Sequence, residues 1–320
     1  MIETPIATLD SMLIAFNSLS PTAGTVRLAL AMSGAARSLT LMLLTGESEQ
    51  AARETVASLQ SLLTRSADQH PTVRIVRLAL GEDPAESIVT TAHDLHANMI
   101  VLALEEDGQE LTGHLASEAK TAGEEVTLNA RIPVMVLRPG MVGQADVPIR
   151  TRRMLVPLDG SAVSRESLPV ATMLARQFGV PVHLVTMVDP VSALPPAYAY
   201  LSSNDPDRQD AVAGLQREAN EALNRTEAIL RHAGSEVTSD LIYGPTGDCL
   251  ISAIQHGDVL VMTTHGKGNA SRSRFGSMAL CTVRESPAPV VIVHPPVTSV
   301  TSEHFQGLWE SGVTSIHSPG

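Results

Sequence analysis

The sequence predicts an α/β protein built from two doubly wound domains, each with a five-stranded parallel sheet. Its 320 residues are too many for one typical domain and suit two. Hydrophobic residues make up 43% of the chain but aromatic residues only 2%, so the cores must be aliphatic, which is typical of parallel sheets covered by helices. The same series of short apolar runs and longer amphipathic stretches occurs twice, which predicts a repeated unit.

The first copy of this series contains five apolar runs with the length of buried strands. An amphipathic stretch from about Glu49 to Ser66 predicts a helix between the second and third runs, and a shorter helix precedes the fourth. Parallel strands joined by helices imply right-handed crossovers. The predicted strands are 12–18, 38–44, a run within 73–84, 99–104 and 132–139.

The second copy repeats the pattern, with a long helix before its third strand. Apolar residues three and four apart run from Leu215 to Leu230, and Gly234 ends the predicted helix. The predicted strands of this copy are 154–161, 181–188, 236–245, 259–264 and 288–295.

Composition places the boundary between the two copies. Residues 140–152 are rich in glycine, proline and charge and lack helical periodicity, which indicates a linker. We therefore expect domains over 1–139 and 153–296, and a tail over 297–320 that is too sparsely hydrophobic for another domain. The final apolar strand of each domain is expected to be available for pairing at an exposed sheet edge.

Charge and cysteine content exclude several classes of protein. The net charge of −12 disfavours a nucleic acid or an anionic membrane as partner. Cys249 and Cys281 are too few for a disulfide framework, and we interpret both as small buried apolar side chains. The N-terminus lacks the pattern of a secretory signal, and no apolar run approaches the roughly 18 residues of a membrane span. A soluble cytoplasmic protein is therefore expected.

The second copy carries a candidate phosphate site after its fourth strand. Ligands of open parallel sheets bind beyond the carboxyl ends of the strands, where the strand order reverses. Gly266 and Gly276 flank this loop, and Gly276 and Ser277 precede a predicted helix that begins at Met278. Glycine lets the backbone approach a phosphate, the first amides of a helix donate to it, and Ser277 is expected to add a hydroxyl at the N-cap.

The loop between those glycines adds positive charge to an otherwise acidic protein. It holds Lys267, Arg272 and Arg274 and no acidic residue, which suits a polyphosphate. A solvated loop followed by an ordinary helix cap has the same glycine spacing, so that alternative stays open.

Two further strand ends offer groups to a nucleotide. Asp159 follows the first strand of the second copy, where its carboxylate or the neighbouring amides can read a ribose or an adenine edge. Equally, Asp159 can form an Asx turn with Gly160 and Ser161 that caps the next helix. Met187 and Val188 end the second strand and offer backbone groups and an apolar wall to a base.

Residues 153–295 resemble an ATP-binding domain of the universal stress protein (UspA) family. The phosphate signature of that family is Gly, two residues, Gly, nine residues, Gly, and then Ser or Thr. This chain departs from the signature at the first glycine, which is Thr263 here. The resemblance implies nucleotide contacts at Pro157, Asp159 and Met187, and a phosphate loop that includes Thr263, His265, Gly266, Gly276, Ser277 and Met278.

The same resemblance implies a Rossmann-like fold of the adenine-nucleotide α-hydrolase type. ATP is the implied cofactor, with Mg²⁺ as a candidate companion of the phosphates. The family's habit of pairing two such domains implies that the tandem chain forms its own pseudo-dimer, and further homodimerisation is open.

The first copy resembles the family in layout only. Asn17 stands where Asp159 stands in the second copy, and Lys120 and Thr121 occupy the position of the phosphate glycine and its serine. Acidic side chains in the loop after the fourth strand would repel a triphosphate, so we expect a degenerate domain without a nucleotide site. The acidic residues are Glu105, Glu106, Asp107 and Glu110.

Three functions are consistent with these patterns. We favour an ATP-binding, nucleotide-responsive regulatory module in the stress response, because no GxSxG, Walker A or HExxH sequence supplies a catalytic centre. A slow ATPase or nucleotide hydrolase is the second, with His265 either as a base or simply as a hydrogen-bond donor to phosphate. An interaction or scaffold protein without a nucleotide is the third. His93 and His96 share a predicted helix but lack a further metal ligand, so we interpret them as a solvated face.

Overall fold

The computed structural model describes residues 9–16, 21–34, 36–45, 53–54, 56–57, 60–61, 72–79, 83–104, 125–138, 150–264 and 276–294. Contacts divide these residues into two compact units, which are described separately. The N-terminal unit comprises the described residues of Thr8–Arg150 and of Pro287–Val297. The C-terminal unit comprises those of Thr151–Ser286. The domain boundaries expected from composition stay a prediction.

The N-terminal unit is built on a parallel sheet with strand order β3-β2-β1-β4-β5. The predicted α/β class is confirmed, and each described strand overlaps its predicted run. Strands β1 and β4 are almost wholly buried because aliphatic side chains cover both of their faces. The strands are β1 (Ser11–Phe16), β2 (Ser38–Thr45), β3 (Thr72–Ala79), β4 (Met99–Ala103) and β5 (Val134–Leu137).

The helices of this unit begin at strong caps. Helix α1 (Ala23–Met32) is capped by Thr22, whose hydroxyl accepts from the amide of Thr25 at 3.2 Å. Helix α3 (Pro84–Asp94) begins with a proline after Asp83, whose carboxylate accepts from the amides of residues 85 and 86. Residues 125–129 are also helical and precede β5.

The last strand of the chain joins the sheet of the N-terminal unit. Strand β10 (Val290–Val293) pairs with β5 in the antiparallel direction, with Val291 opposite Met135. We expected the final strand of each half to be able to pair at an exposed sheet edge. The structure pairs the two final strands with each other, and all four residues of β10 are buried.

The C-terminal unit has a second parallel sheet, with strand order β9-β6-β7-β8. Its first strand in the sequence, β6, therefore lies between β7 and β9. The strand order reverses at β6, as in a doubly wound sheet. The strands are β6 (Arg153–Leu158), β7 (Val182–Val188), β8 (Val237–Tyr243) and β9 (Asp258–Thr263).

The connections between these strands are mostly helical. Helices α5 (Ala162–Arg165) and α6 (Leu168–Phe178) connect β6 to β7, and α9 (Thr246–Ala253) connects β8 to β9. Helix α7 (Pro190–Ala193), the short 3₁₀ helix η2 (Pro196–Tyr200) and the long α8 (Pro206–His232) connect β7 to β8. Helix α10 (Ser277–Glu285) follows β9 in the sequence.

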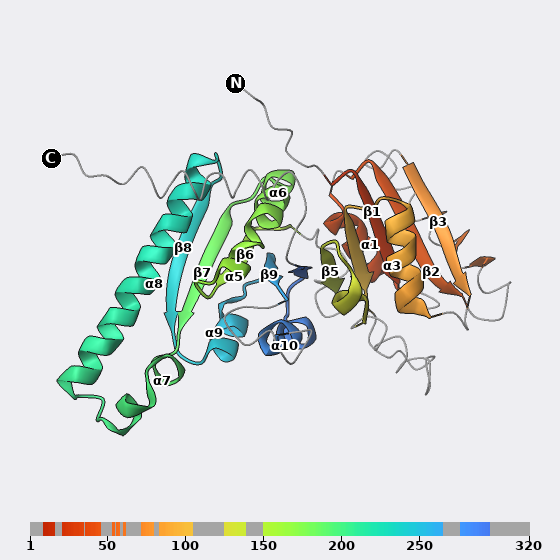
Figure 1. Cartoon of the computed structure of the whole chain (residues 1–320). Helices are drawn as coiled ribbons and strands as arrows, with labels where there is room; N and C mark the ends of the chain where they lie inside the picture. The colour runs from red at the N-terminus through yellow and green to blue at the C-terminus, as the bar shows by residue number, and fades with distance from the viewer. Residues whose placement is uncertain are drawn as a thin grey trace. The chain divides into compact units, whose positions relative to one another are not determined.

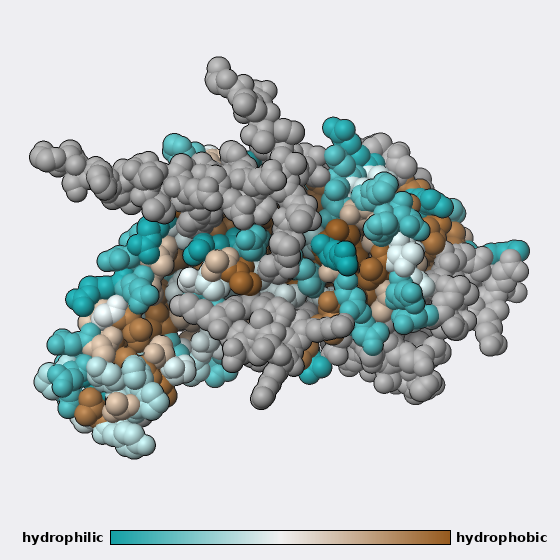
Figure 2. Space-filling model, viewed as in Figure 1, coloured by the Kyte–Doolittle hydropathy of each residue, from teal (hydrophilic) through white to brown (hydrophobic). Residues whose placement is uncertain are grey.

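Helix α8 begins earlier than the apolar spacing predicts. Asp205 caps it and Pro206 is its first residue, so the start is set by local chemistry rather than by burial. Its buried residues Leu223, Thr226 and Leu230 lie three or four apart and face β7 and β8. The other end of the helix extends past the strand ends (Figure 1). Figure 2 shows a mixed polar and apolar surface at that end. Val191 of the short helix α7 is 79% exposed.

The described helices were also compared with the length and hydropathy of a membrane span. None of them has an apolar stretch sufficient to cross a bilayer.

Candidate functional site

The candidate site lies at the carboxyl edge of the sheet in the C-terminal unit. Because β6, β7, β8 and β9 are parallel, their carboxyl ends share this edge. Asp159 follows β6 and Thr264 follows β9, on either side of the point where the strand order reverses. Open sheets bind ligands at this point.

Asp159 shapes the backbone after β6. Its Oδ1 accepts a hydrogen bond from the amide of Ser161 at 2.9 Å, and Gly160 between them has a positive φ of 80°. Ser161 in turn caps α5 by accepting from the amide of Ser164 at 3.0 Å. The Asx turn that the sequence left open is therefore present, and it fixes Asp159 at the strand end without excluding a ligand contact.

A backbone hydrogen bond brings α10 to the end of β9. The amide of Gly276 donates to the carbonyl oxygen of Thr264 at 2.7 Å. The first intrahelical bond of α10 follows, from the amide of Leu280 to the carbonyl of Gly276 at 3.1 Å. The amides of residues 277–279 thus have no acceptor within the helix, and no side chain among the described residues caps it.

Gly276, rather than Ser277, occupies the N-cap. The sequence predicted a hydroxyl cap at Ser277, but the helix starts one residue earlier than expected, so Ser277 is its first residue. Gly276 has φ −65° and ψ 142°, which is ordinary extended backbone. The backbone conformation therefore does not require glycine here.

The other predicted contact residues lie on the same edge. Pro157 is buried in β6, opposite Val185 of β7. Met187 is half-buried and is the second-last residue of β7, and Thr263 is buried as the final residue of β9. Met278 lies in the first turn of α10, with its methyl group close to Gly247 at the start of α9. These residues lie at or near the carboxyl ends of β6, β7 and β9 and at the start of α10.

Part of the predicted site lies outside the described residues. His265, Gly266, Lys267, Arg272 and Arg274 all fall in the interval 265–275. The residues that suggested a degenerate first copy also lie outside the described part of the chain: Asn17, Glu105, Glu106, Asp107, Glu110, Lys120 and Thr121.

Two residues important to the site were missed in the sequence. Thr264 contributes a backbone carbonyl, which no side-chain motif can reveal. Gly244 donates its amide to the carbonyl of Val188 at 3.1 Å and so holds the ends of β7 and β8 together. Gly244 has a φ of 133°, a conformation that favours glycine. The Gly-Pro pair directly after a strand is the sequence pattern that could have indicated this residue.

The opposite edge of this sheet contains a buried ion pair. Arg153 begins β6 and Asp258 begins β9, and their side chains form a two-pronged pair at 2.9 and 3.0 Å. His183 lies nearby in β7, with its Nδ1 2.8 Å from Thr238 Oγ1 and its Nε2 3.3 Å from Asp240 Oδ2. Burial, with the Arg153 charge as a second cause, lowers the pKa of His183. These groups stabilise the fold and lie away from the candidate site.

The described residues also include histidines, carboxylates and two thiols outside the candidate site. Within the described residues no cluster of three or more His, Cys, Asp or Glu side chains is placed to hold a metal ion. Cys249 and Cys281 are free thiols and are half-buried rather than buried, because each lies on a helix at the rim of the sheet. Burial raises the pKa of the Cys281 thiol, with Glu285 as a further cause.

Comparison with known families decides what this unit is. Residues 150–294 match the Universal stress protein family. This region is a universal stress protein domain. The match includes β10, the strand that pairs with β5. A curated universal stress protein of Methanocaldococcus jannaschii is 25% identical over 149 residues, which are 45% of this chain and 83% of that protein.

Solved structures extend the likeness to most of the chain. A universal stress protein from Archaeoglobus fulgidus aligns with a TM-score of 0.56 and 14% identity, covering 90% of this chain and 99% of that one. A functionally unknown protein from Pseudomonas aeruginosa aligns with a TM-score of 0.58 and 14% identity, covering 95% and 97%. At 14% identity, this likeness shows a shared fold and nothing more.

Proposed function

We propose that this protein binds one ATP per chain at the carboxyl edge of the C-terminal unit and acts as a nucleotide-responsive regulator. Membership of residues 150–294 in the universal stress protein family supports a role in the stress response. The nucleotide, its regulatory consequence and a cytoplasmic location go beyond that family membership and are part of the proposal.

One observation gives the main support for nucleotide binding. The N-terminus of α10 lacks a side-chain cap and is held beside the end of β9 by the bond from Gly276 to Thr264. Three consecutive backbone amides there have no acceptor within the helix, and the helix dipole adds a partial positive charge. This arrangement suits a phosphate group.

The remaining residues fit the other parts of ATP. Met187 and the buried Pro157 offer an apolar wall to the adenine ring. Asp159 is a carboxylate and would repel phosphates, so we assign it and its turn to the ribose. The cations of 265–275 would add charge for the triphosphate, and Mg²⁺ could accompany the phosphates.

The N-terminal unit is proposed to lend structure rather than a second nucleotide site. The pairing of β5 with β10 supports this role, because it makes the last strand of the universal stress protein domain part of the N-terminal sheet. The same pairing supports the proposal of an intrachain pseudo-dimer.

Calorimetric titration of the nucleotide-free full chain with ATP tests the proposal. We expect one site per chain, and a loss of affinity of at least roughly ten-fold in Gly276→Val, since a bulky side chain displaces the phosphate from the amides. Gly214→Ala is the matched control, because Gly214 lies within α8 with open space around it and away from the site. Two sites per chain, no binding, or unchanged affinity in Gly276→Val would contradict the proposal.

A further inference from the structure

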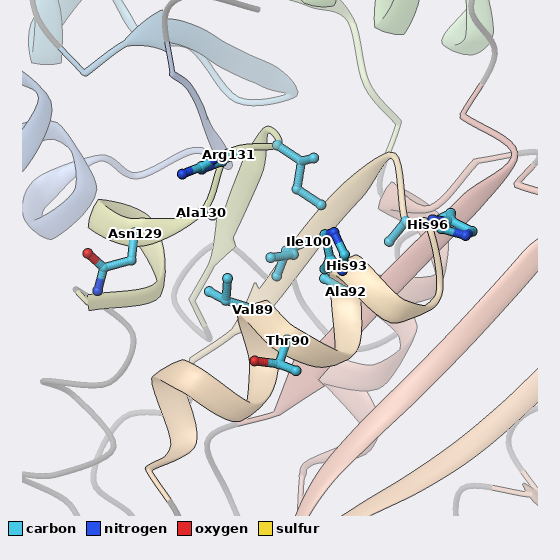
Figure 3. Close-up of a pocket in the computed structure, with 11 residues that line it drawn as sticks. Val89, Thr90, Ala92, His93, His96, Ile100, Asn129, Ala130 and Arg131 are labelled. Carbon is cyan, nitrogen blue, oxygen red and sulfur yellow. The ribbon is translucent and has the colours of Figure 1, made fainter. Parts of the chain in front are cut away.

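A second pocket lies in the N-terminal unit, at the amino ends of β4 and β5. Its volume is about 560 Å³, within the range of roughly 300 to 1,000 Å³ that is usual for small-molecule sites. Residues of α3 and of the turn after it form one side, and residues 129–132 before β5 form the other (Figure 3). This edge is opposite to the carboxyl ends, so the pocket is distinct from the position at which the proposed nucleotide site lies in the other unit.

The inner surface of the pocket is aliphatic. Ile100 is fully buried at its base, so the accessible aliphatic surface comes mainly from the half-buried Val89 and Ile132. No Phe, Tyr or Trp takes part in the lining. A short, flexible alkyl chain would contact the aliphatic groups of Val89 and Ile132 along one side. The aliphatic lining residues are Val89, Ala92, Ala97, Ile100, Ala130 and Ile132.

The rim of the pocket is polar and cationic. Arg131, His93 and His96 are exposed there, together with Thr90 and Asn129. None of the eleven lining residues is acidic, although the chain contains 34 Asp and Glu residues. Within the described part of the chain, Arg131 forms no ion pair. This arrangement offers a hydrogen-bond donor set to an anion.

His96 occupies a backbone position that normally selects glycine. Its φ is 49°, and it is the one residue other than glycine with a positive φ in the described part of the chain. The amide of His96 donates to the carbonyl oxygen of His93 at 3.0 Å, and the amide of Ala97 donates to the carbonyl oxygen of Ala92 at 2.9 Å. These two bonds form a Schellman motif, in which glycine is the favoured residue at the position of His96. The histidine side chain is therefore kept at the rim at the expense of backbone strain.

Two features act against an anion and limit its affinity. His93 Nδ1 lies 3.6 Å from the carboxylate of Asp94, which competes for that imidazole. The C-terminus of α3 also carries partial negative charge, although the Schellman bonds satisfy its last carbonyls. Arg131 remains as the group that would contact an anion most directly, because His96 lies on the other side of the pocket (Figure 3).

We propose that this pocket binds a small aliphatic carboxylate. The alkyl chain lies against the half-buried Val89 and Ile132, above the buried alanines and Ile100, and the carboxylate lies at the rim, where Arg131 can donate two parallel hydrogen bonds. Hexanoate has the right parts: one carboxylate and an unbranched chain of five carbons. Because the pocket is open at its rim, we expect a Kd on the order of 1 mM.

Methyl nuclear magnetic resonance of the full-length chain, labelled at alanine and isoleucine methyls, tests the proposal with hexanoate as probe. Hexanoate should shift the signals of Ala92, Ala97, Ala130 and Ile100 in a saturable way. The signals of Ala171 and Ala175, which are buried in α6 of the other unit, should not move. Hexan-1-ol and hexylammonium should bind at least several-fold more weakly, because they lack the anion.

Two variants and one control separate an effect on hexanoate binding from an effect on folding. Arg131→Gln should weaken hexanoate binding roughly ten-fold by removing the charge-assisted pair. Arg74→Gln, on the exposed surface of β3, is the matched control and should bind as the unaltered chain does. His96→Gly should weaken binding while it raises Tm, because glycine relieves the backbone strain.

Three results would overturn the proposal: no saturable shift at the pocket methyls, equal binding of hexan-1-ol, or unchanged binding by Arg131→Gln. Any of these results would mean that Arg131 and the two histidines interact only with helix C-termini and do not recognise a bound carboxylate. A rise in Tm in His96→Gly together with full hexanoate affinity would show that the strained histidine has no part in binding and would remove that step of the argument.

Discussion

The amide of Gly276 lies 2.7 Å from the carbonyl oxygen of Thr264 and donates a hydrogen bond to it. This bond joins the end of β9 to the first turn of α10 directly, across residues 265–275 of the sequence. The orientation of the helix N-terminus at the sheet edge is therefore fixed by backbone groups.

Two glycines at this edge are expected to respond differently to substitution by alanine. Gly276 has φ −65°, so Gly276→Ala should change the free energy of unfolding little. Gly244 has φ 133°, and a Cβ there would lie 2.9 Å from the Sγ of Cys249. Gly244→Ala should destabilise the C-terminal unit by about 1 to 3 kcal/mol or more. Urea unfolding of the two variants measures the difference.

The double variant Gly244→Ala with Cys249→Ala provides the control. Removing the sulfur relieves the contact but not the backbone strain, so stability should return only in part. Equal stability of Gly244→Ala and Gly276→Ala would show that the positive φ of Gly244 imposes no requirement for glycine.

The ion pair between Arg153 and Asp258 is expected to be costly to break from one side. The side chain of Asp258 is 1% exposed, and it accepts from Arg153 and from the amide of Gln255 at 2.8 Å. Asp258→Ala leaves a guanidinium and an amide without their acceptor, so we expect a loss of about 3 to 5 kcal/mol in the free energy of unfolding. Chemical denaturation followed by circular dichroism measures it.

Replacing both partners tests the reason for that loss. The variant Arg153→Met with Asp258→Leu removes both charges and fills similar space, so it should recover most of the stability. If the double variant is as unstable as Asp258→Ala, the loss comes from packing at the start of β6 and β9 and not from an unpaired charge.

His183 is expected to make the stability of the C-terminal unit depend on pH. Its pKa is lowered in the folded chain, first by burial and then by Arg153. The unfolded state then takes up the proton more readily, at a value of about 6.5, so stability is full above that pH and falls as the pH drops below it toward the lowered folded value. His183→Gln should flatten this part of the profile between about pH 7 and pH 5.

The matched control for this pH effect is His256→Gln, an exposed histidine of the same unit. It should leave the profile of unfolding free energy against pH as it is in the unaltered chain. A profile that is equally steep in His183→Gln would assign the pH dependence to other groups.

ATP turnover, if it occurs, is expected to be far below the typical enzyme value of roughly 10 per second. The described part of the site provides amides and a carboxylate held in a turn, but no side chain placed as a general base. Phosphate release from the purified chain measures the rate. A rate near the typical value that is lost in His265→Ala, with ATP affinity unchanged, would instead support the hydrolase alternative.

The sequence was sufficient to place the strands, because a buried strand must be apolar along its length whatever it pairs with. The runs at 99–104 and 259–264 match β4 and β9 closely for this reason. It also indicated the sheet edge with Asp159 and Gly276, because a parallel doubly wound sheet gathers the carboxyl ends of its strands at one edge. The apolar spacing did not locate the start of α8, since the capping residues of its first turn do not follow that spacing.

Only the tertiary structure decided the rest. Apolarity records how much of a strand is buried but not the direction of its neighbour, so the antiparallel pairing of β10 with β5 could not be read from the sequence. The N-cap at Gly276 depends on a carbonyl, which has no signature in the residue type. Arg153 and Asp258 are 105 residues apart, and the two sides of the pocket at His96 and Arg131 come from different elements. Such groups become neighbours only when the chain folds, because long-range proximity is set by sheet order and not by spacing along the chain.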